Sequence, residues 1–189
     1  MRAVHVEVEA ANDAWAGAVL THPHPDFGGD RFNAVIDALY RRLPAAGITT
    51  LRFDFSSSEL SIAAAETLDA MRHLPIRPLV LVGYSFGADV AASIDDERVA
   101  GWFLVAPPLI DAKRPRPVAT DPRPKAIVLP EHDQFSSPGR SSHITERWVN
   151  AAVSFVPGAD HFLVGHTQPV VDHALGWFRA TFIPSPPAD

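Results

Sequence analysis

The sequence predicts an α/β fold in which helices cover both faces of a mostly parallel, twisted sheet. Strand-like and helix-like segments alternate along most of the 189 residues, and several of the strand-like segments are apolar throughout. Strands without a polar face are typical of parallel sheets, because the crossover helices bury both sides. The length suits one domain, and no repeat or linker divides the chain. We therefore expect a single domain over residues 1–183 and a disordered proline-rich tail over 184–189.

The spacing of apolar residues along the chain predicts each strand and helix in turn. Alternation of apolar and polar residues in 4–8 is typical of a half-exposed edge strand, whereas continuous apolar runs indicate buried strands. Apolar residues at helical spacing, with charges between them, indicate an amphipathic helix over 30–43. The expected strands are 4–8, 15–22, 48–55, 78–83, 99–106, 125–130 and 151–157. The expected helices are 30–43, 59–74, 86–94, one around 140–150, and 169–182.

Composition excludes several classes of function. The chain has no cysteine, which rules out disulfides, thiolate nucleophiles and cysteine-bound zinc. A net charge of -6 argues against nucleic acid or an anionic membrane as a partner. The first residues lack a long apolar segment, and no apolar run approaches the ~18 residues of a membrane span. We expect a cytoplasmic monomer or homodimer that acts on a small molecule.

The segment 83–87 reads Gly-Tyr-Ser-Phe-Gly and separates the apolar strand 78–83 from the helix 86–94. Gly-x-Ser-x-Gly in this context is the pattern of a nucleophile elbow, a sharp turn that raises the serine hydroxyl above the sheet. The start of the following helix also supplies backbone N–H groups beside Ser85. The pattern therefore predicts that Ser85 is a nucleophile.

An acid and a base follow later strands in the order that such a serine requires. A serine hydroxyl attacks only when a base accepts its proton, and a carboxylate usually orients that base. Asp133 follows the strand 125–130, and His161 follows the strand 151–157. Glu131 is the alternative acid, and His166 is the alternative base.

Five motifs together resemble the α/β-hydrolase superfamily. They are HPHPDFGG (22–29), LRFDF (51–55), VGYSFGADV (82–90), EHDQF (131–135) and GADHF (158–162). More narrowly, the chain is similar to small bacterial HPHP-containing hydrolases related to dienelactone hydrolase. The resemblance implies a near-minimal α/β-hydrolase fold without a large cap domain, and it assigns nucleophile, acid and base to Ser85, Asp133 and His161.

One loop departs from the pattern of these relatives. Residues 56–61 read SSSELS, where the subgroup usually has a glycine-rich stretch of the form RGVGxSxG. That loop normally lines the mouth of the active site. The substrate of the relatives is therefore not transferred to this chain.

The segment HPHPDFGG has two interpretations. In the resemblance it forms part of an oxyanion hole, in which the backbone N–H of Phe86 is one donor and the loop provides a second. Pro23 and Pro25 have no N–H, so His24 is the expected second donor. Alternatively, His-x-His-x-Asp could bind zinc, although the further histidines of such a site have no clear spacing.

The favoured function is a serine hydrolase that cleaves an ester or thioester without a cofactor or metal. A non-catalytic binding protein with the same fold is the alternative, and a metal-dependent hydrolase that uses the HPHPD loop is a third possibility. Six prolines crowd residues 107–124 and exclude one regular element there. This segment is either a substrate lid or a plain connection.

Overall fold

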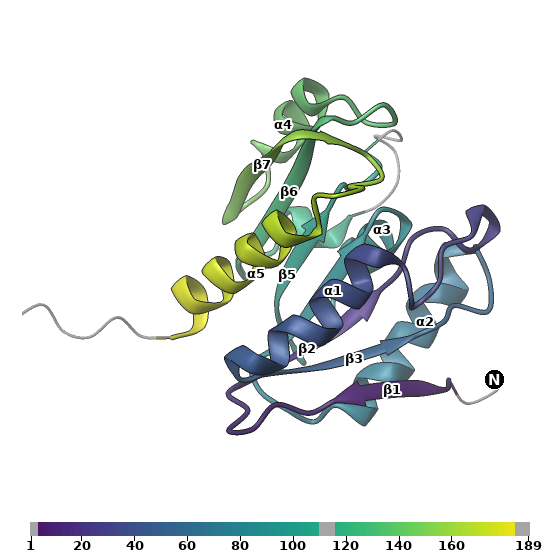
Figure 1. The fold of residues 1–189 in the computed structure, drawn as a ribbon, viewed down its shortest axis with the longest axis vertical. Coiled ribbons are helices and arrows are strands. Elements are labelled where there is room, and N and C mark those ends of the chain that lie inside the picture. The colour runs from purple at the N-terminus through teal and green to yellow at the C-terminus, as the bar shows by residue number, and fades with distance from the viewer. Residues whose placement is uncertain (1–3, 110–115, 184–189) are drawn as a thin grey trace, which may run out of the picture.

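The computed structural model describes residues 4–109 and 116–183 and contains a seven-stranded sheet in the order β1-β3-β2-β4-β5-β6-β7 (Figure 1). The edge strand β1 runs antiparallel to β3, and all other neighbouring pairs are parallel. The strands are β1 Val6–Glu9, β2 Ala16–Thr21, β3 Ile48–Phe53, β4 Leu79–Tyr84, β5 Val99–Val105, β6 Lys125–His132 and β7 Ala151–Asp160. The expected fold class is confirmed.

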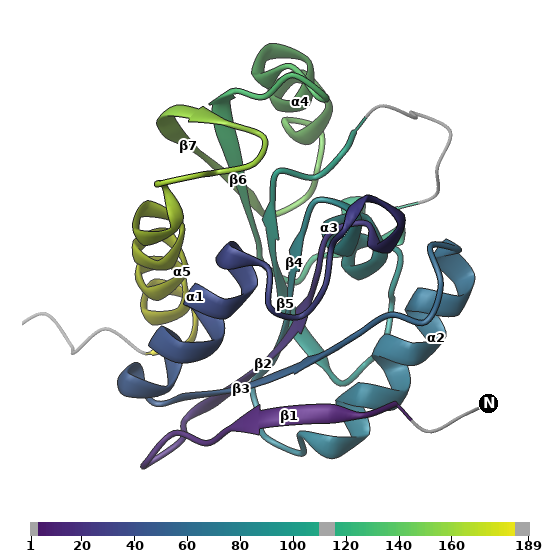
Figure 2. The same ribbon diagram turned by 45° about the vertical axis from the view of Figure 1, so that its right-hand side comes forward.

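Helices cover both faces of this sheet (Figure 2). They are α1 Ala34–Arg42, α2 Leu60–Ala70, α3 Phe86–Ala92, α4 Pro138–Thr145 and α5 Thr167–Phe182. Side chains of α1 and α5 share one apolar core with one face of the sheet, and side chains of α2 and α3 share a second core with the other face. Because both faces are buried, β2, β3 and β4 are buried along their whole length.

Some boundaries differ from the sequence-based expectation. The helix around 140–150 spans only Pro138–Thr145, and the strand over 151–157 continues to Asp160. The helix over 30–43 begins at Ala34, because Asn33 Oδ1 accepts a hydrogen bond from Val35 N at 3.0 Å and caps the helix. Residues 110–115 of the proline-rich segment, interpreted as either a lid or a plain connection, and the tail 184–189, expected to be disordered, lie outside the described residues.

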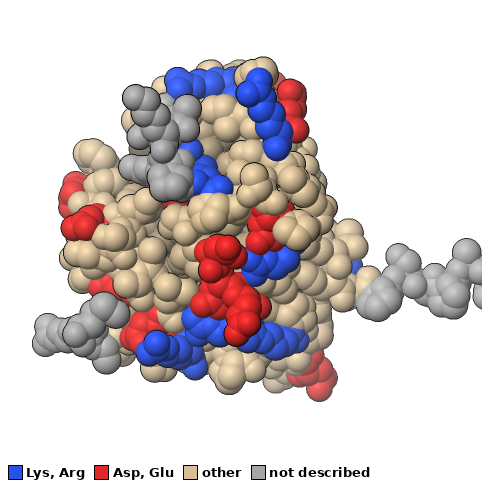
Figure 3. All heavy atoms as spheres, turned by 180° about the vertical axis from the view of Figure 1, so that it is seen from behind, with Lys and Arg blue, Asp and Glu red and all other residues tan. Residues whose placement is uncertain are grey.

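Charges of both signs lie side by side on the face opposite to the view of Figure 1 (Figure 3). Basic and acidic side chains are therefore interspersed on the described part of this face that the view shows. Within residues 4–109 and 116–183, no helix combines the length and the hydropathy needed to cross a bilayer.

Candidate active site

Ser85 occupies a strained turn between β4 and α3. Its backbone has φ 54° and ψ -118°, a conformation that is rare for a residue with a side chain. A Cβ atom on Gly87 would lie 2.1 Å from the carbonyl oxygen of Thr21, and one on Gly83 would lie 2.4 Å from the carbonyl oxygen of Gly87. Only glycine fits both positions, so the two flanking glycines let β2, β4 and α3 pack closely around the serine.

The structure brings Ser85, His161 and Asp133 into one hydrogen-bonded chain. Ser85 Oγ lies 2.9 Å from His161 Nε2, and His161 Nδ1 lies 2.7 Å from Asp133 Oδ2. The histidine and the aspartate are buried, at 6% and 7% exposure. Ser85 and His161 are 76 positions apart in the sequence, and Asp133 and His161 are 28 positions apart. All three meet at the carboxyl ends of β4, β6 and β7.

Asp133 is held in its ionised form. Its Oδ1 atom accepts hydrogen bonds from the backbone N–H groups of Phe135 at 2.8 Å and Ser136 at 3.0 Å. Burial acts to raise the pKa of Asp133, but the hydrogen bonds from His161, Ser136 and Phe135 outweigh burial and hold the pKa below its ordinary value of 3.8. An ionised carboxylate only accepts hydrogen bonds, so Nδ1 of His161 carries a proton. In the neutral ring, Nε2 can then accept a hydrogen bond from Ser85.

Two further residues fix the position of His161. The Tyr84 hydroxyl donates to the carbonyl oxygen of His161 at 2.7 Å, and the His161 N–H donates to Gln134 Oε1 at 3.1 Å. Neither residue is predicted by a motif in the sequence. Their only signal is adjacency, since Tyr84 precedes Ser85 and Gln134 follows Asp133.

The alternative acid and base lie elsewhere. Glu131 is exposed, and its Oε2 atom accepts a hydrogen bond from the N–H of Gly158 at 2.7 Å. The ring of His166 uses Nδ1 to bond the carbonyl oxygen of Val164 at 2.9 Å, on the exposed start of α5. Neither side chain forms a hydrogen bond with Ser85, Asp133 or His161 among the described residues.

The two residues expected to supply the oxyanion donors are in contact through their rings, and their backbone N–H groups have no acceptor among the described residues. Phe86 is the first residue of α3, and the His24 ring packs against its ring with centroids 5.0 Å apart. In the described part of the chain, neither backbone N–H has a hydrogen-bond acceptor. His24 Nδ1 is likewise buried without a hydrogen-bond partner there, so aromatic contacts rather than polar contacts hold this ring.

Two polar side chains of the HPHPD loop, those of His22 and Asp26, form hydrogen bonds within the protein. His22 uses both ring nitrogens, with Nδ1 2.6 Å from the carbonyl oxygen of Pro23 and Nε2 2.9 Å from the backbone nitrogen of Phe55. The Asp26 carboxylate accepts from Ser58 Oγ at 2.7 Å, which joins this loop to the atypical SSSELS loop. The described residues contain no group of three His, Asp or Glu side chains arranged to bind a metal.

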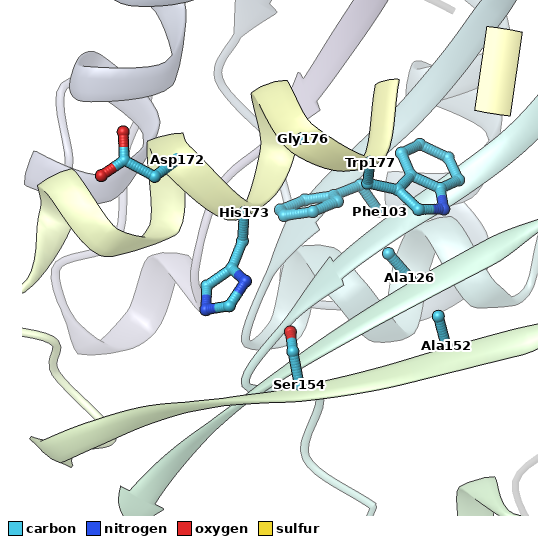
Figure 4. A pocket seen from close by; sticks show the side chains of 8 residues that line it. All are labelled: Phe103, Ala126, Ala152, Ser154, Asp172, His173, Gly176 and Trp177. Carbon is cyan, nitrogen blue, oxygen red and sulfur yellow. The ribbon is translucent and has the colours of Figure 1, made fainter. Parts of the chain in front are cut away.

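A separate hollow of about 290 Å³ lies between α5 and strands β5, β6 and β7 (Figure 4). Its lining residues are Phe103, Ala126, Ala152, Ser154, Asp172, His173, Gly176 and Trp177. None of these belongs to the Ser85 site. The hollow is therefore distinct from the candidate active site.

Comparisons with known proteins support the fold. No protein-family model matches the chain. An uncharacterised protein of Rickettsia prowazekii is 25% identical over 174 residues, which cover 80% of this chain and 73% of that protein. A protein of unknown function from Agrobacterium tumefaciens, a putative α/β hydrolase, superposes with a TM-score of 0.79 at 24% identity and covers 97% of this chain and 95% of its own.

A serine hydrolase without a lid from Xanthomonas campestris superposes with a TM-score of 0.80 at 20% identity. The superposition covers 96% of this chain and 90% of the Xanthomonas chain. Strand order, helix layers and these structural neighbours agree, and no cap domain interrupts the described part of the sheet. The chain therefore has the α/β-hydrolase fold.

Proposed function

We propose that this protein is a serine hydrolase that cleaves an ester or thioester by acyl transfer. The observation that supports this proposal best is the continuous chain of hydrogen bonds from Ser85 Oγ through His161 to Asp133. Ser85 itself lies in a strained turn. Nucleophile, base and orienting acid are the three parts that this chemistry requires. In this proposal Ser85, His161 and Asp133 have those roles in that order.

The reaction proceeds in two balanced halves. Ser85 Oγ attacks the carbonyl carbon while His161 Nε2 takes the hydroxyl proton, and the resulting oxyanion accepts hydrogen bonds from the N–H groups of Phe86 and His24. Collapse of this intermediate breaks the bond to the alcohol or thiol, which leaves with the proton from His161. Water then attacks the acyl-enzyme by the same route, which releases the acid and restores Ser85.

Exposed aromatic rings beside the site favour an apolar acyl group. Phe135 and Phe162 are 52% and 55% exposed, and both contact the His161 ring, with centroids 4.7 Å and 6.0 Å away. Phe27, at 88% exposure, contacts the His24 ring at 4.8 Å. We name these three phenylalanines the apolar rim. An ester with an apolar acyl chain would cover surface that otherwise faces water.

Turnover of chromogenic esters and acyl-thioesters tests the proposal. Wild type should hydrolyse at least one member of a panel of acetyl to octanoyl substrates, and Ser85→Ala should lose turnover by on the order of 10⁶. A circular dichroism spectrum of the variant checks that the fold is intact. Turnover retained by a folded Ser85→Ala would contradict the proposed mechanism, whereas binding of acyl compounds without turnover in wild type would favour a non-catalytic binding protein.

A further inference from the structure

The ring of His22 has a defined tautomer. The backbone N–H of Phe55 donates to Nε2 at 2.9 Å, so Nε2 carries no proton. In a neutral ring the proton is then on Nδ1, which lies 2.6 Å from the carbonyl oxygen of Pro23 and donates to it. His22 therefore links the end of β3 to the loop that follows β2.

The carbonyl that His22 binds belongs to the same peptide unit as the His24 N–H. This Pro23–His24 peptide is planar and trans, so its carbonyl and its N–H point in opposite directions. Fixing the Pro23 oxygen consequently fixes the direction of the His24 N–H. A donor on the carbonyl also polarises the peptide and strengthens its N–H as a donor.

Gly29 supports this peptide as well. A Cβ atom on Gly29 would lie 2.3 Å from the Pro23 oxygen, so any larger residue would displace that carbonyl. The Gly29 N–H donates to the His24 carbonyl at 3.0 Å and closes the loop. The ring of His22 and the backbone of Gly29 together leave the Pro23–His24 peptide little room to rotate.

Burial keeps the His22 ring neutral. His22 is only 1% exposed, and burial lowers its pKa from the ordinary value of 6.5. The hydrogen bond to Pro23 and the charges of Asp54, Asp30 and Glu66 act in the opposite direction, and burial outweighs them. The neutral form is the one that can accept from Phe55 and donate to Pro23 at once.

We propose that His22 is a positioning residue for the oxyanion hole, which aims the His24 N–H through a hydrogen bond to the Pro23 carbonyl. The proposal rests on the proposed hydrolase function. His22 touches no reacting atom in it. Its contribution appears in the transition state, when negative charge develops on the substrate oxygen.

Two substitutions of His22 distinguish the roles of its two ring nitrogens. In His22→Asn the amide nitrogen stands near the place of Nδ1 and can still donate to Pro23, while the bond from Phe55 is lost. In His22→Gln the amide oxygen reaches toward the place of Nε2 and can still accept from Phe55, while the donor to Pro23 is lost. A purely structural role for His22 would make activity follow thermal stability in both variants.

Steady-state hydrolysis and the rate of fluorophosphonate labelling provide the readouts. We expect His22→Gln to lower kcat by about 10- to 100-fold with KM little changed, somewhat less than the 10²–10³-fold typical for complete loss of an oxyanion donor. His22→Asn should stay much closer to wild type in kcat even if its Tm is lower. Equal loss in both variants, or loss that follows Tm, would overturn the proposal.

A measurement on the unmodified protein covers the case in which a variant does not fold. Long-range ¹H–¹⁵N NMR of the histidine rings should show His22 protonated at Nδ1, and protonation at Nε2 would overturn the proposal. If the proposed hydrolase function itself is wrong, wild type would not be labelled by fluorophosphonate. This outcome is different from failure of the proposed role of His22. Labelled wild type with an equally fast His22→Gln variant would overturn only the role of His22.

Discussion

His161 Nδ1 lies 2.7 Å from Asp133 Oδ2, and both side chains are almost fully buried. The two residues belong to loops that follow neighbouring parallel strands, β6 and β7. A short hydrogen bond between a carboxylate and an imidazole fixes both the orientation of the ring and the nitrogen that carries the proton.

Replacement of Asp133 by asparagine should abolish most activity without disturbing the fold. The asparagine oxygen can still accept from Phe135 and Ser136, but its amide nitrogen donates to His161 Nδ1 and forces the ring proton onto Nε2. The histidine then cannot accept the serine proton. We expect kcat to fall roughly 10⁴-fold, the size typical when a triad carboxylate becomes an amide. The matched control is Glu131→Gln, which should keep wild-type kcat, and the opposite pattern would make Glu131 the acid.

Substitution of Gly87 by alanine should destabilise the protein, because the new methyl group would lie 2.1 Å from the carbonyl oxygen of Thr21. Overpacking of this kind costs about 1–3 kcal/mol in the free energy of unfolding. Gly176→Ala in α5 is the matched control, since no atom other than those of its chain neighbours and its own helix backbone lies within 4 Å of its Cβ position. This substitution should stabilise the protein by about 0.5–1 kcal/mol. Urea titrations of both variants measure the difference. A Gly87→Ala variant as stable as wild type would contradict the close packing at the elbow.

Acid should destabilise the wild-type protein partly through His22. Since burial lowers the pKa of His22 in the folded state, the unfolded chain binds this proton first as pH falls below 6.5. The contribution of neutral His22 to the free energy of unfolding is therefore fully present above pH 6.5 and is lost as pH falls toward the folded-state pKa. This loss is at most about 1.4 kcal/mol per pH unit. His22→Gln lacks the titrating ring and should lose less stability between pH 7 and pH 5. Parallel pH profiles for the two proteins would show that His22 is not held neutral.

The apolar rim should select for longer acyl chains. Phe135→Ala removes a ring that is about half exposed beside His161. If an acyl chain covers this ring, the contact contributes roughly 1 kcal/mol to the binding free energy. We expect kcat/KM to fall about fivefold for octanoyl esters and to change little for acetyl esters. Phe155→Ala on β7 removes a similarly exposed ring away from the site and serves as the control. Equal effects on both chain lengths would mean that Phe135 acts by shielding His161 and not by binding substrate.

The sequence predicted the fold, and it singled out Ser85, Asp133 and His161, which the structure brings together, because both predictions depend on local patterns. Apolar strands alternate with helices, and the elbow motif requires glycines on both sides of Ser85 for a reason that the packing confirms. The tertiary hydrogen bonds were not predictable. Tyr84 reaches a carbonyl 77 positions away, and His22 reaches an amide 33 positions away, and no spacing in the sequence encodes these contacts.

The ends of several helices and strands were also not predictable from the sequence patterns. The strand expected over 151–157 continues to Asp160, because pairing with β6 extends as far as His132 and Asp160 through an irregularity in the register. The helix expected around 140–150 ends at Thr145. Pairing with a neighbouring strand and packing against the sheet decide such boundaries, and a single sequence contains neither.

The most direct test of the central proposal is the intact mass of the protein after treatment with a fluorophosphonate, with wild type and Ser85→Ala run in parallel. Only a serine activated by a neighbouring base reacts readily with this reagent. We expect one adduct on wild type and none on the folded variant. No adduct on folded wild type, or the same adduct on Ser85→Ala, would contradict it.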